Sequence, residues 1–206
     1  MTEADRPQLY LITPPTFDAE VFPAKLASVL DSADLACLRL SLSSRDEDEI
    51  ARAADALREV AHARDVALVI EKHVQLVERL GLDGVHLTDG ARNVRKIRKD
   101  LGQDAIIGSF CGNTRHEGIS AAAAGADYVA FGPVGETALG DGTRAENDLF
   151  AWWSDMIEVP VVAEGALTED LVRSLTPVTD FFAFGEEIWR HEDPAAALAG
   201  LLKAMG

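Results

Sequence analysis

Residues 46–70, DEDEIARAADALREVAHARDVALVI, contain the repeating unit that decides the fold. In residues 46–63, Ile50, Ala54 and Leu57 recur at three- and four-residue steps with charged residues between them, which predicts an amphipathic helix. Residues 66–70 form a short run of Val, Ala, Leu and Ile, typical of a strand that is buried on both faces. The stretch therefore predicts a helix that leads into a parallel strand.

Eight short apolar runs of this kind alternate with amphipathic segments along the chain. They occupy residues 8–12, 35–40, 66–70, 84–87, 105–110, 127–131, 159–163 and 180–184. Eight β-α units predict one α/β domain over residues 1–206, a single (β/α)8 TIM barrel. An open doubly wound sheet is the alternative, but six strands would suffice for it, and no GxGxxG follows the first run.

The composition excludes several classes of protein. Hydrophobic residues make up 48% of the chain and charged residues 26%, which indicates a globular protein and not a disordered one. The formal net charge is −16, from 19 Lys+Arg against 35 Asp+Glu, and such a surface repels nucleic acid backbones and anionic lipid headgroups. We therefore expect neither a nucleic acid partner nor a membrane partner.

The sequence also indicates a cytoplasmic location. Residues 1–7 have no apolar core of an export signal, and no stretch approaches the roughly 18 apolar residues of a membrane span. The two cysteines, Cys37 and Cys111, belong to no zinc-binding motif. Trp152 and Trp153 are adjacent on a predicted helix, so one should be exposed, as in a homo-oligomer contact.

Candidate site residues lie where each predicted strand ends, because barrel enzymes place their reacting groups at the C-terminal ends of the strands. Fourteen positions qualify, namely Thr13, Arg39, Ser41, Glu71, Lys72, His86, Asp89, Ser109, Cys111, Thr137, Glu164, Gly165, Gly185 and Glu186. The irregular segment 132–147, which contains several glycines, is predicted to be a lid over the same end of the barrel.

Several segments carry a resemblance that spans nearly the whole chain. They are LYLIT at 9–13, GVHL at 84–87, IIGS at 106–109, GADYVAFGPV at 125–134, VPVVAEGAL at 159–167 and DPAAAL at 193–198. Together they resemble thiamine phosphate synthase and its thiazole tautomerase relatives. GADYVAFGPV followed by Thr137 is the most specific of these segments.

The resemblance implies a reaction that joins hydroxymethylpyrimidine diphosphate to a thiazole phosphate, with Mg²⁺ and basic groups stabilising the departing diphosphate. The family's Gln-x-Arg-x-Lys pattern after strand two is here Cys37, Arg39 and Ser41, which keeps only the arginine. The metal-binding Asn-Asp pair after strand three is here Glu71 and Lys72. A protonated lysine cannot bind a metal ion, although its charge could replace that of the ion.

The later strand ends depart from the family as well. Asp89 is the candidate for the remaining metal ligand after strand four, but its partner carboxylate has been replaced. The hydroxyl and lysine loop after strand six keeps only Thr137, and the catalytic His of the tautomerases is here Pro133. After strands seven and eight, where the family binds the thiazole phosphate, the chain has Glu164, Gly165, Gly185, Glu186 and Glu187. Carboxylates there would repel a phosphate.

By this resemblance, Arg39 and Lys72 are the candidate catalytic residues and Asp89 is the candidate ligand of Mg²⁺. The candidate substrate-binding residues are Arg39, Glu71, His86, Ser109, Thr137, Glu164, Gly165, Gly185 and Glu186. Two readings of Arg39 stay open, a phosphate clamp or an ion-pair partner of Glu71 or Glu164. Lys72 is either a substitute cation or the solvated start of the next helix, and His86 is expected to make structural hydrogen bonds.

Two functions follow from these replacements. The first is a thiamine phosphate synthase of thiamine biosynthesis, acting on the two phosphorylated substrates. The second is a catalytically impaired or divergent relative that binds a thiamine-related or other small ligand, or a protein partner.

Overall fold

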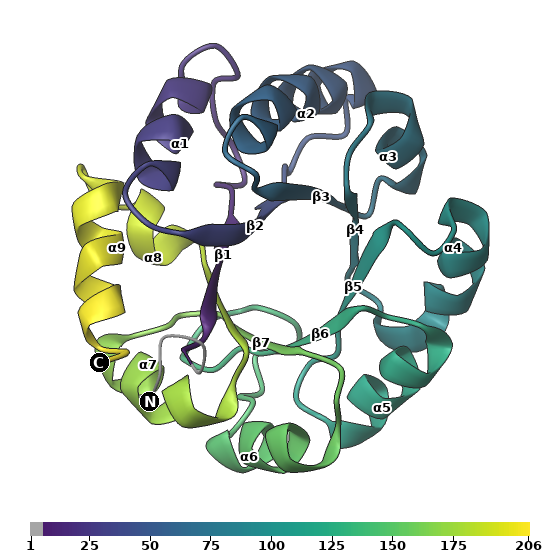
Figure 1. Ribbon diagram of the computed structural model, residues 1–206, viewed down its shortest axis with the longest axis vertical. Coiled ribbons are helices and arrows are strands. Elements are labelled where there is room, and N and C mark those ends of the chain that lie inside the picture. The colour runs from purple at the N-terminus through teal and green to yellow at the C-terminus, as the bar shows by residue number, and fades with distance from the viewer. Residues whose placement is uncertain (1–5) are drawn as a thin grey trace.

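The computed structural model describes residues 6–206, in which eight parallel strands close into a barrel because β8 pairs with β1 (Figure 1). The strands are β1 (Gln8–Ile12), β2 (Leu35–Leu40), β3 (Ala67–Glu71), β4 (Gly84–Leu87), β5 (Ile106–Phe110), β6 (Tyr128–Phe131), β7 (Val161–Glu164) and β8 (Phe181–Phe184). The predicted (β/α)8 barrel is therefore confirmed. Residues 1–5, which make up most of the N-terminal segment 1–7, lie outside the described residues.

Five strands begin one or two residues later than the apolar runs predict. The backbone N–H of Val66 donates to Ala61 at the end of the preceding helix and not to a neighbouring strand. Residue 160 is a proline, which has no N–H for the strand ladder. Hydrophobicity marks which residues are buried, whereas strand bounds depend on where each N–H group donates.

Helices surround the barrel and cover its outer face (Figure 1). They are α1 (Phe22–Leu30), α2 (Glu47–His62), α3 (Val74–Leu80), α4 (Val94–Leu101), α5 (Arg115–Ala124), α6 (Asn147–Met156), α7 (Glu169–Leu175), α8 (Glu186–Trp189) and α9 (Pro194–Lys203), with 3₁₀ turns η2 (Gly90–Arg92) and η3 (Thr176–Val178). Asp46 caps the predicted helix α2 by accepting hydrogen bonds from the N–H groups of Asp48 and Glu49. None of the helices in residues 6–206 has the length and apolar character needed to cross a membrane.

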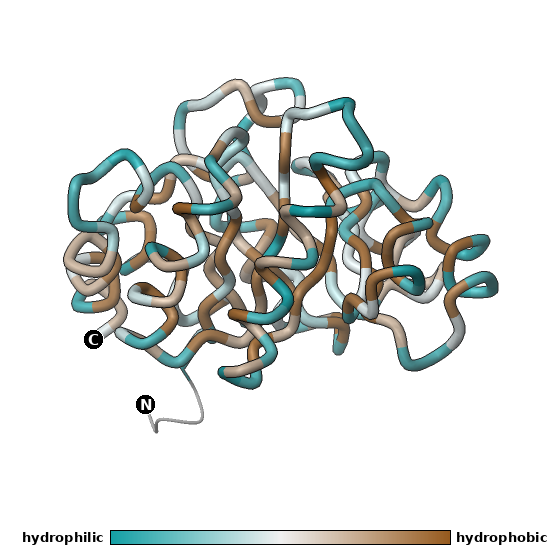
Figure 2. Tube along the Cα trace, turned by 90° about the horizontal axis from the view of Figure 1, so that it is seen from above, coloured by the Kyte–Doolittle hydropathy of each residue, from teal (hydrophilic) through white to brown (hydrophobic). Residues whose placement is uncertain are grey.

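The apolar core has two layers. The larger layer lies between the strands and the helices, where Figure 2 shows hydrophobic segments inside and hydrophilic ones outside. The smaller layer fills the barrel interior and includes Tyr10, Cys37 and Tyr128. Trp153 is fully buried, while Trp152 is half-buried beneath the guanidinium of Arg115, 4.5 Å from its ring centroid. The predicted exposed tryptophan is thus partly covered by a cation.

Three aspartates repeat one contact at the N-terminal end of the barrel. Asp83, Asp127 and Asp180 each precede an even-numbered strand, and their carboxylates accept hydrogen bonds from the N–H groups of Leu68, Ile107 and Val161 at 2.7, 2.7 and 2.8 Å. Each aspartate also donates its own N–H to the carbonyl of the same residue. These two-point contacts fix β4 to β3, β6 to β5 and β8 to β7.

Candidate functional site at the barrel mouth

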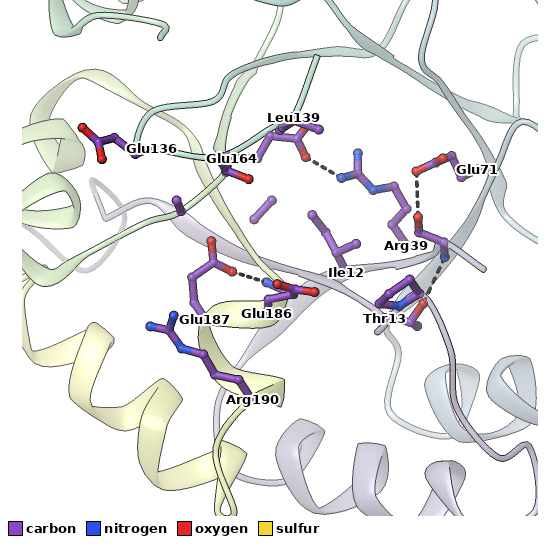
Figure 3. A pocket seen from close by; sticks show the side chains of 17 residues that line it. Ile12, Thr13, Arg39, Glu71, Glu136, Leu139, Glu164, Glu186, Glu187 and Arg190 are labelled. Carbon is purple, nitrogen blue, oxygen red and sulfur yellow. Dashed lines mark hydrogen bonds and ion pairs between the residues drawn. The ribbon is translucent and has the colours of Figure 1, made fainter. Parts of the chain in front are cut away.

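A cavity of about 370 Å³ opens at the C-terminal ends of the strands (Figure 3). Nine of the fourteen predicted site residues line it, namely Thr13, Arg39, Ser41, Glu71, Thr137, Glu164, Gly165, Gly185 and Glu186. The other five, Lys72, His86, Asp89, Ser109 and Cys111, do not line this cavity. The barrel therefore brings together in one cavity most of the residues predicted at the C-terminal ends of the strands.

Arg39 of β2 and Glu164 of β7 form a buried ion pair across the barrel. Arg39 Nη2 donates to Glu164 Oε2, and the two side chains are only 5% and 1% exposed. The ion pair expected for Arg39 with Glu71 or Glu164 is therefore formed with Glu164. The charge of the only cation inside the barrel, among the described residues, is thus balanced by an internal carboxylate.

Burial affects the two groups of this pair in opposite ways. Loss of hydration raises the pKa of the Glu164 carboxyl, and the charge of Arg39 opposes that rise. Burial lowers the pKa of the Arg39 guanidinium, but Glu164, Tyr10, Tyr128 and Glu71 together hold it above its ordinary value. Arg39 is therefore charged at every physiological pH.

A hydrogen-bonded chain runs from this pair down the barrel axis. A guanidinium can only donate, so Arg39 Nη1 donates to His86 Nε2, and the other ring nitrogen of His86 donates to the Tyr128 hydroxyl at 2.9 Å. The Tyr128 hydroxyl lies 2.7 Å from that of Tyr10. His86 is thus a neutral imidazole, and burial, Arg39 and Lys72 hold its pKa well below 6.5.

The two tyrosines of this hydrogen-bonded chain, Tyr10 and Tyr128, are not among the predicted site residues. Tyr128 fits inside the barrel because Gly108 of β5 has no side chain, and a Cβ there would lie 1.9 Å from the Tyr128 ring. The alternation of inward and outward side chains along the strands could have identified these tyrosines as residues of the barrel interior. Arg39 and Cys37 share the inner face of β2, and Tyr10 is in register with Cys37 on the neighbouring strand.

Glu187 is also not among the predicted site residues. Its carboxylate accepts the backbone N–H of Gly185 at 2.7 Å and that of Leu167 at 3.0 Å. These amides belong to the loops that follow β8 and β7. Glu187 therefore already binds two donors that would otherwise face an anion at this side of the mouth.

The remaining carboxylates also give the mouth an acidic character. Glu71 accepts a hydrogen bond from the Ser41 hydroxyl at 2.9 Å and pairs with Lys72 at 3.1 Å. Glu136 and Glu186 are exposed at the rim of the cavity. Five glutamates and two arginines line the cavity, so its walls carry net negative charge.

The predicted metal ligand does not lie in a metal site. Asp89 is exposed, accepts a hydrogen bond from Asn93 Nδ2 at 2.7 Å, and does not line the cavity. Residues 6–206 contain no cluster of three His, Cys, Asp or Glu side chains that could hold a metal ion. The ammonium of Lys72 also lies beside Glu71, where it competes with a cation. The donor set therefore does not fit Mg²⁺, which needs at least two oxygen ligands in octahedral geometry.

The other predicted residues take supporting positions. Ser109 is buried and donates to the carbonyl of Gly90 at 2.9 Å. The side chain of Lys72 is 61% exposed, and its backbone has a positive φ of 68°. Cys111 is buried, which raises the pKa of its thiol to about 12 and makes it unreactive.

The loop between β6 and α6 reaches over the mouth. Glu136, Thr137 and Leu139 from this loop line the cavity, and Leu139 packs against the side chains of the barrel interior. Gly140 follows with a φ of +64°, a conformation that favours glycine. The segment predicted to be a lid thus forms one wall of the site.

The chain is similar in sequence to one protein family over most of its length. The model of the family Thiamine monophosphate synthase matches residues 9–179. A thiamine-phosphate synthase of Rhodospirillum centenum is 40% identical over 201 residues, which cover 96% of this chain and 97% of that protein. The thiamine-phosphate synthase of Erythrobacter litoralis is 36% identical over 206 residues, covering 97% and 96%.

Solved structures show the same fold at lower identity. A thiamine phosphate pyrophosphorylase from Pyrococcus furiosus superimposes with a TM-score of 0.83 and 21% identity, covering 96% of this chain and 95% of that chain. A 3-hexulose-6-phosphate synthase superimposes with a TM-score of 0.72 and 16% identity, covering 96% and 99%. At these identities the structural likeness concerns the fold alone.

Proposed function

The chain belongs to the thiamine monophosphate synthase family, and we propose that it is a divergent member that binds a small thiamine-related ligand at its barrel mouth with little or no synthase turnover. The observation that carries this proposal is the buried ion pair of Arg39 and Glu164. A departing diphosphate needs positive charge directed at it, and an arginine that is already paired inside the barrel supplies little. We further propose that the protein acts in the cytoplasm.

The anion-binding donors of the mouth support the same conclusion. Glu187 occupies the N–H groups of Gly185 and Leu167, and Glu186 adds a negative charge beside them. A phosphate at this position would have to displace one carboxylate and approach another. A ligand that offers a cationic or amine-bearing group suits these walls better, because carboxylates accept from N–H donors.

The first experiment is a synthase assay of the purified protein with hydroxymethylpyrimidine diphosphate, thiazole phosphate and Mg²⁺. The Rhodospirillum centenum relative is assayed beside it. Since loss of a single preorganised donor for a developing anion costs about 10²–10³-fold in kcat, we expect kcat/KM to be lower by at least about 10³-fold. Turnover equal to that of the relative would overturn the proposal.

A second experiment tests the role of the ion pair directly. Titration calorimetry with pyrophosphate compares the wild type with Glu164→Gln and with Glu136→Gln, which removes the same charge from the exposed rim. We expect at least about tenfold tighter binding for Glu164→Gln only, because Arg39 then keeps an uncompensated charge. Equal effects of the two substitutions would mean that net charge, and not the pairing of Arg39, limits anion binding.

An active synthase is the second candidate, and the 40% identity to the Rhodospirillum centenum relative over 96% of the chain favours it. In that case the Arg39–Glu164 pair would have to open when substrate binds. The synthase assay distinguishes the two candidates, since tight binding of thiamine or thiamine phosphate without turnover supports only the divergent member.

A further inference from the structure

A second cavity lies at the end of the barrel opposite the mouth. It has a volume of about 250 Å³, and none of the residues that line it lines the mouth cavity. Three of its lining residues are the first residues of their strands, namely Ala67 of β3, Ile106 of β5 and Phe181 of β8. We call it the N-terminal cavity, because it opens where the strands begin.

The walls of the N-terminal cavity are mostly apolar. The interior of a (β/α)8 barrel is normally filled by bulky side chains, but Ala36 and Ala67 place only methyl groups here. Aromatic rings of Tyr10, Tyr128 and Phe181 form much of the remaining wall, and the two tyrosine rings pack edge to face with centroids 5.7 Å apart. This combination suits the burial of a flat apolar group.

The N-terminal cavity offers no free charge to a ligand. Among the described residues, Asp127 is the only charged residue that lines it. The Asp127 carboxylate pairs with Arg98 at 2.5 Å and accepts the backbone N–H of Ile107 at 2.7 Å. An anion would be repelled by this carboxylate, and a cation would have to compete with Arg98. The cavity therefore suits a neutral molecule.

The two tyrosine hydroxyls leave one proton without a strong acceptor. Their oxygens lie 2.7 Å apart, and the Tyr128 oxygen also accepts from His86 at 2.9 Å. Burial raises the pKa of both tyrosines, so both hydroxyls keep their protons. Only one of these two protons can lie between the two oxygens. The other has no oxygen or nitrogen acceptor within residues 6–206.

The direction of the hydrogen-bonded chain assigns this proton to Tyr10. Because Tyr128 already accepts from His86, a chain polarised in one direction continues from the Tyr128 hydroxyl to the Tyr10 oxygen. The Cys37 sulfur beside Tyr10 is only a weak acceptor. Tyr10 is 2% exposed, and a buried donor without a strong acceptor lowers stability until an acceptor is supplied.

We infer that the N-terminal cavity binds a small neutral aromatic molecule with one hydrogen-bond acceptor, such as a carbonyl oxygen, directed at the Tyr10 hydroxyl. An apolar cavity of about 150 Å³ is large enough to hold benzene, so the N-terminal cavity has room for a ring with a short substituent. The site shares no lining residue with the mouth, so the inference does not depend on which ligand binds there.

Titration calorimetry of the full chain with acetophenone and with α-methylstyrene tests this inference. The two molecules have nearly the same shape, but α-methylstyrene has a CH₂ group in place of the carbonyl oxygen. We expect acetophenone to bind about tenfold more tightly, because α-methylstyrene leaves the buried hydroxyl unpaired. Benzoate should bind at least about tenfold more weakly than acetophenone, because its charge would lose hydration beside Asp127.

Two variants of the same kind locate the ligand. Ala67→Leu fills part of the N-terminal cavity, whereas Ala123→Leu adds the same side chain at an exposed position of α5. We expect Ala67→Leu to weaken the binding of acetophenone and α-methylstyrene by at least about tenfold, because the added atoms occupy the space of the ligand. Ala123→Leu should bind both molecules as the wild type does.

A third variant tests the hydrogen bond. It carries Tyr10→Phe and Tyr128→Phe, which keep both rings and remove both hydroxyls. We expect it to bind acetophenone no more tightly than α-methylstyrene. Circular dichroism spectra establish whether each variant is folded, and if this one is not, the comparison of the two ligands on the wild type still decides the question.

Three outcomes would overturn the inference. Neither molecule binds the wild type up to its limit of solubility, the wild type binds both with equal affinity, or Ala67→Leu binds acetophenone as tightly as Ala123→Leu does. The last result would place the ligand elsewhere on the protein, including the mouth.

Discussion

At the scale of single residues, the hydrogen-bonded chain through His86 fixes the properties of the site. His86 Nε2 accepts from Arg39, and a ring nitrogen that accepts cannot carry a proton. Protonation of His86 would place a second positive charge against a buried guanidinium. The neutral ring and the ionised Arg39–Glu164 pair therefore require each other.

This arrangement predicts how stability depends on pH. The pKa of His86 is lowered in the folded state and ordinary, about 6.5, in the unfolded state, so the unfolded chain binds the extra proton. We expect His86 to contribute a loss of stability as pH falls below about 6.5, with a slope of up to about 1.4 kcal/mol per pH unit, and no loss above it. Urea unfolding between pH 7 and pH 5 measures the slope.

The variant His86→Gln is the control for this prediction. Its amide oxygen can still accept from Arg39, but the side chain does not titrate. Its stability should depend less steeply on pH than that of the wild type. Parallel pH profiles for the two proteins would contradict the assignment.

At the scale of elements, the repeated aspartate contact attaches each even-numbered strand to its predecessor. The Asp180 carboxylate accepts the Val161 N–H at 2.8 Å, and Asp180 has no ion-pair partner among residues 6–206. This makes Asp180 the simplest of the three to examine, because Asp83 also contacts His62 and Asp127 also contacts Arg98. The contact lies at the end of the barrel opposite the mouth.

We expect Asp180→Ala to lower the free energy of unfolding by about 1.5–3 kcal/mol, the usual contribution of a hydrogen bond to a charged group. Asp180→Asn keeps an acceptor oxygen and should lose less. Guanidinium denaturation of both variants provides the measurement. If the two substitutions cost the same, the carboxylate is not acting as an acceptor for Val161.

At the scale of the whole molecule, closure of the barrel makes the first and last strands depend on each other. β1 pairs with β8 through four residues, from Gln8 with Phe181 to Leu11 with Phe184. Trp189, just beyond β8, donates its indole N–H to the carbonyl of Ile12 at 2.6 Å. A chain without these segments would leave two unpaired strand edges.

Closure predicts that the chain unfolds as one domain. Differential scanning calorimetry should show a single transition with equal calorimetric and van't Hoff enthalpies. A protein that ends at residue 178, without β8 and the last two helices, should not reach the native fold. Two separate transitions, or a folded fragment of residues 1–178, would contradict the single-domain prediction.

The fold and most positions of the site could be predicted from the sequence alone. Strands and the helix α2 follow from apolar spacing, which is a local property. Nine site residues, from Thr13 to Glu186, could be assigned to the mouth because all parallel strands of a barrel end on the same side. Neither inference requires knowing which side chains touch.

Only the tertiary structure shows which buried side chains form ion pairs and hydrogen bonds with each other. Arg39 and Glu164 are 125 positions apart, and Tyr10 and Tyr128 are 118 apart, so no local pattern reveals their contacts. The exposure of the Lys72 side chain and the two backbone amides that bind Glu187 depend on how the loops after the strands fold, which sequence spacing does not show. Sequence spacing predicts at which end of the barrel a charged side chain lies. The electrostatic effect of that side chain depends on its burial and on the partner that folding places beside it.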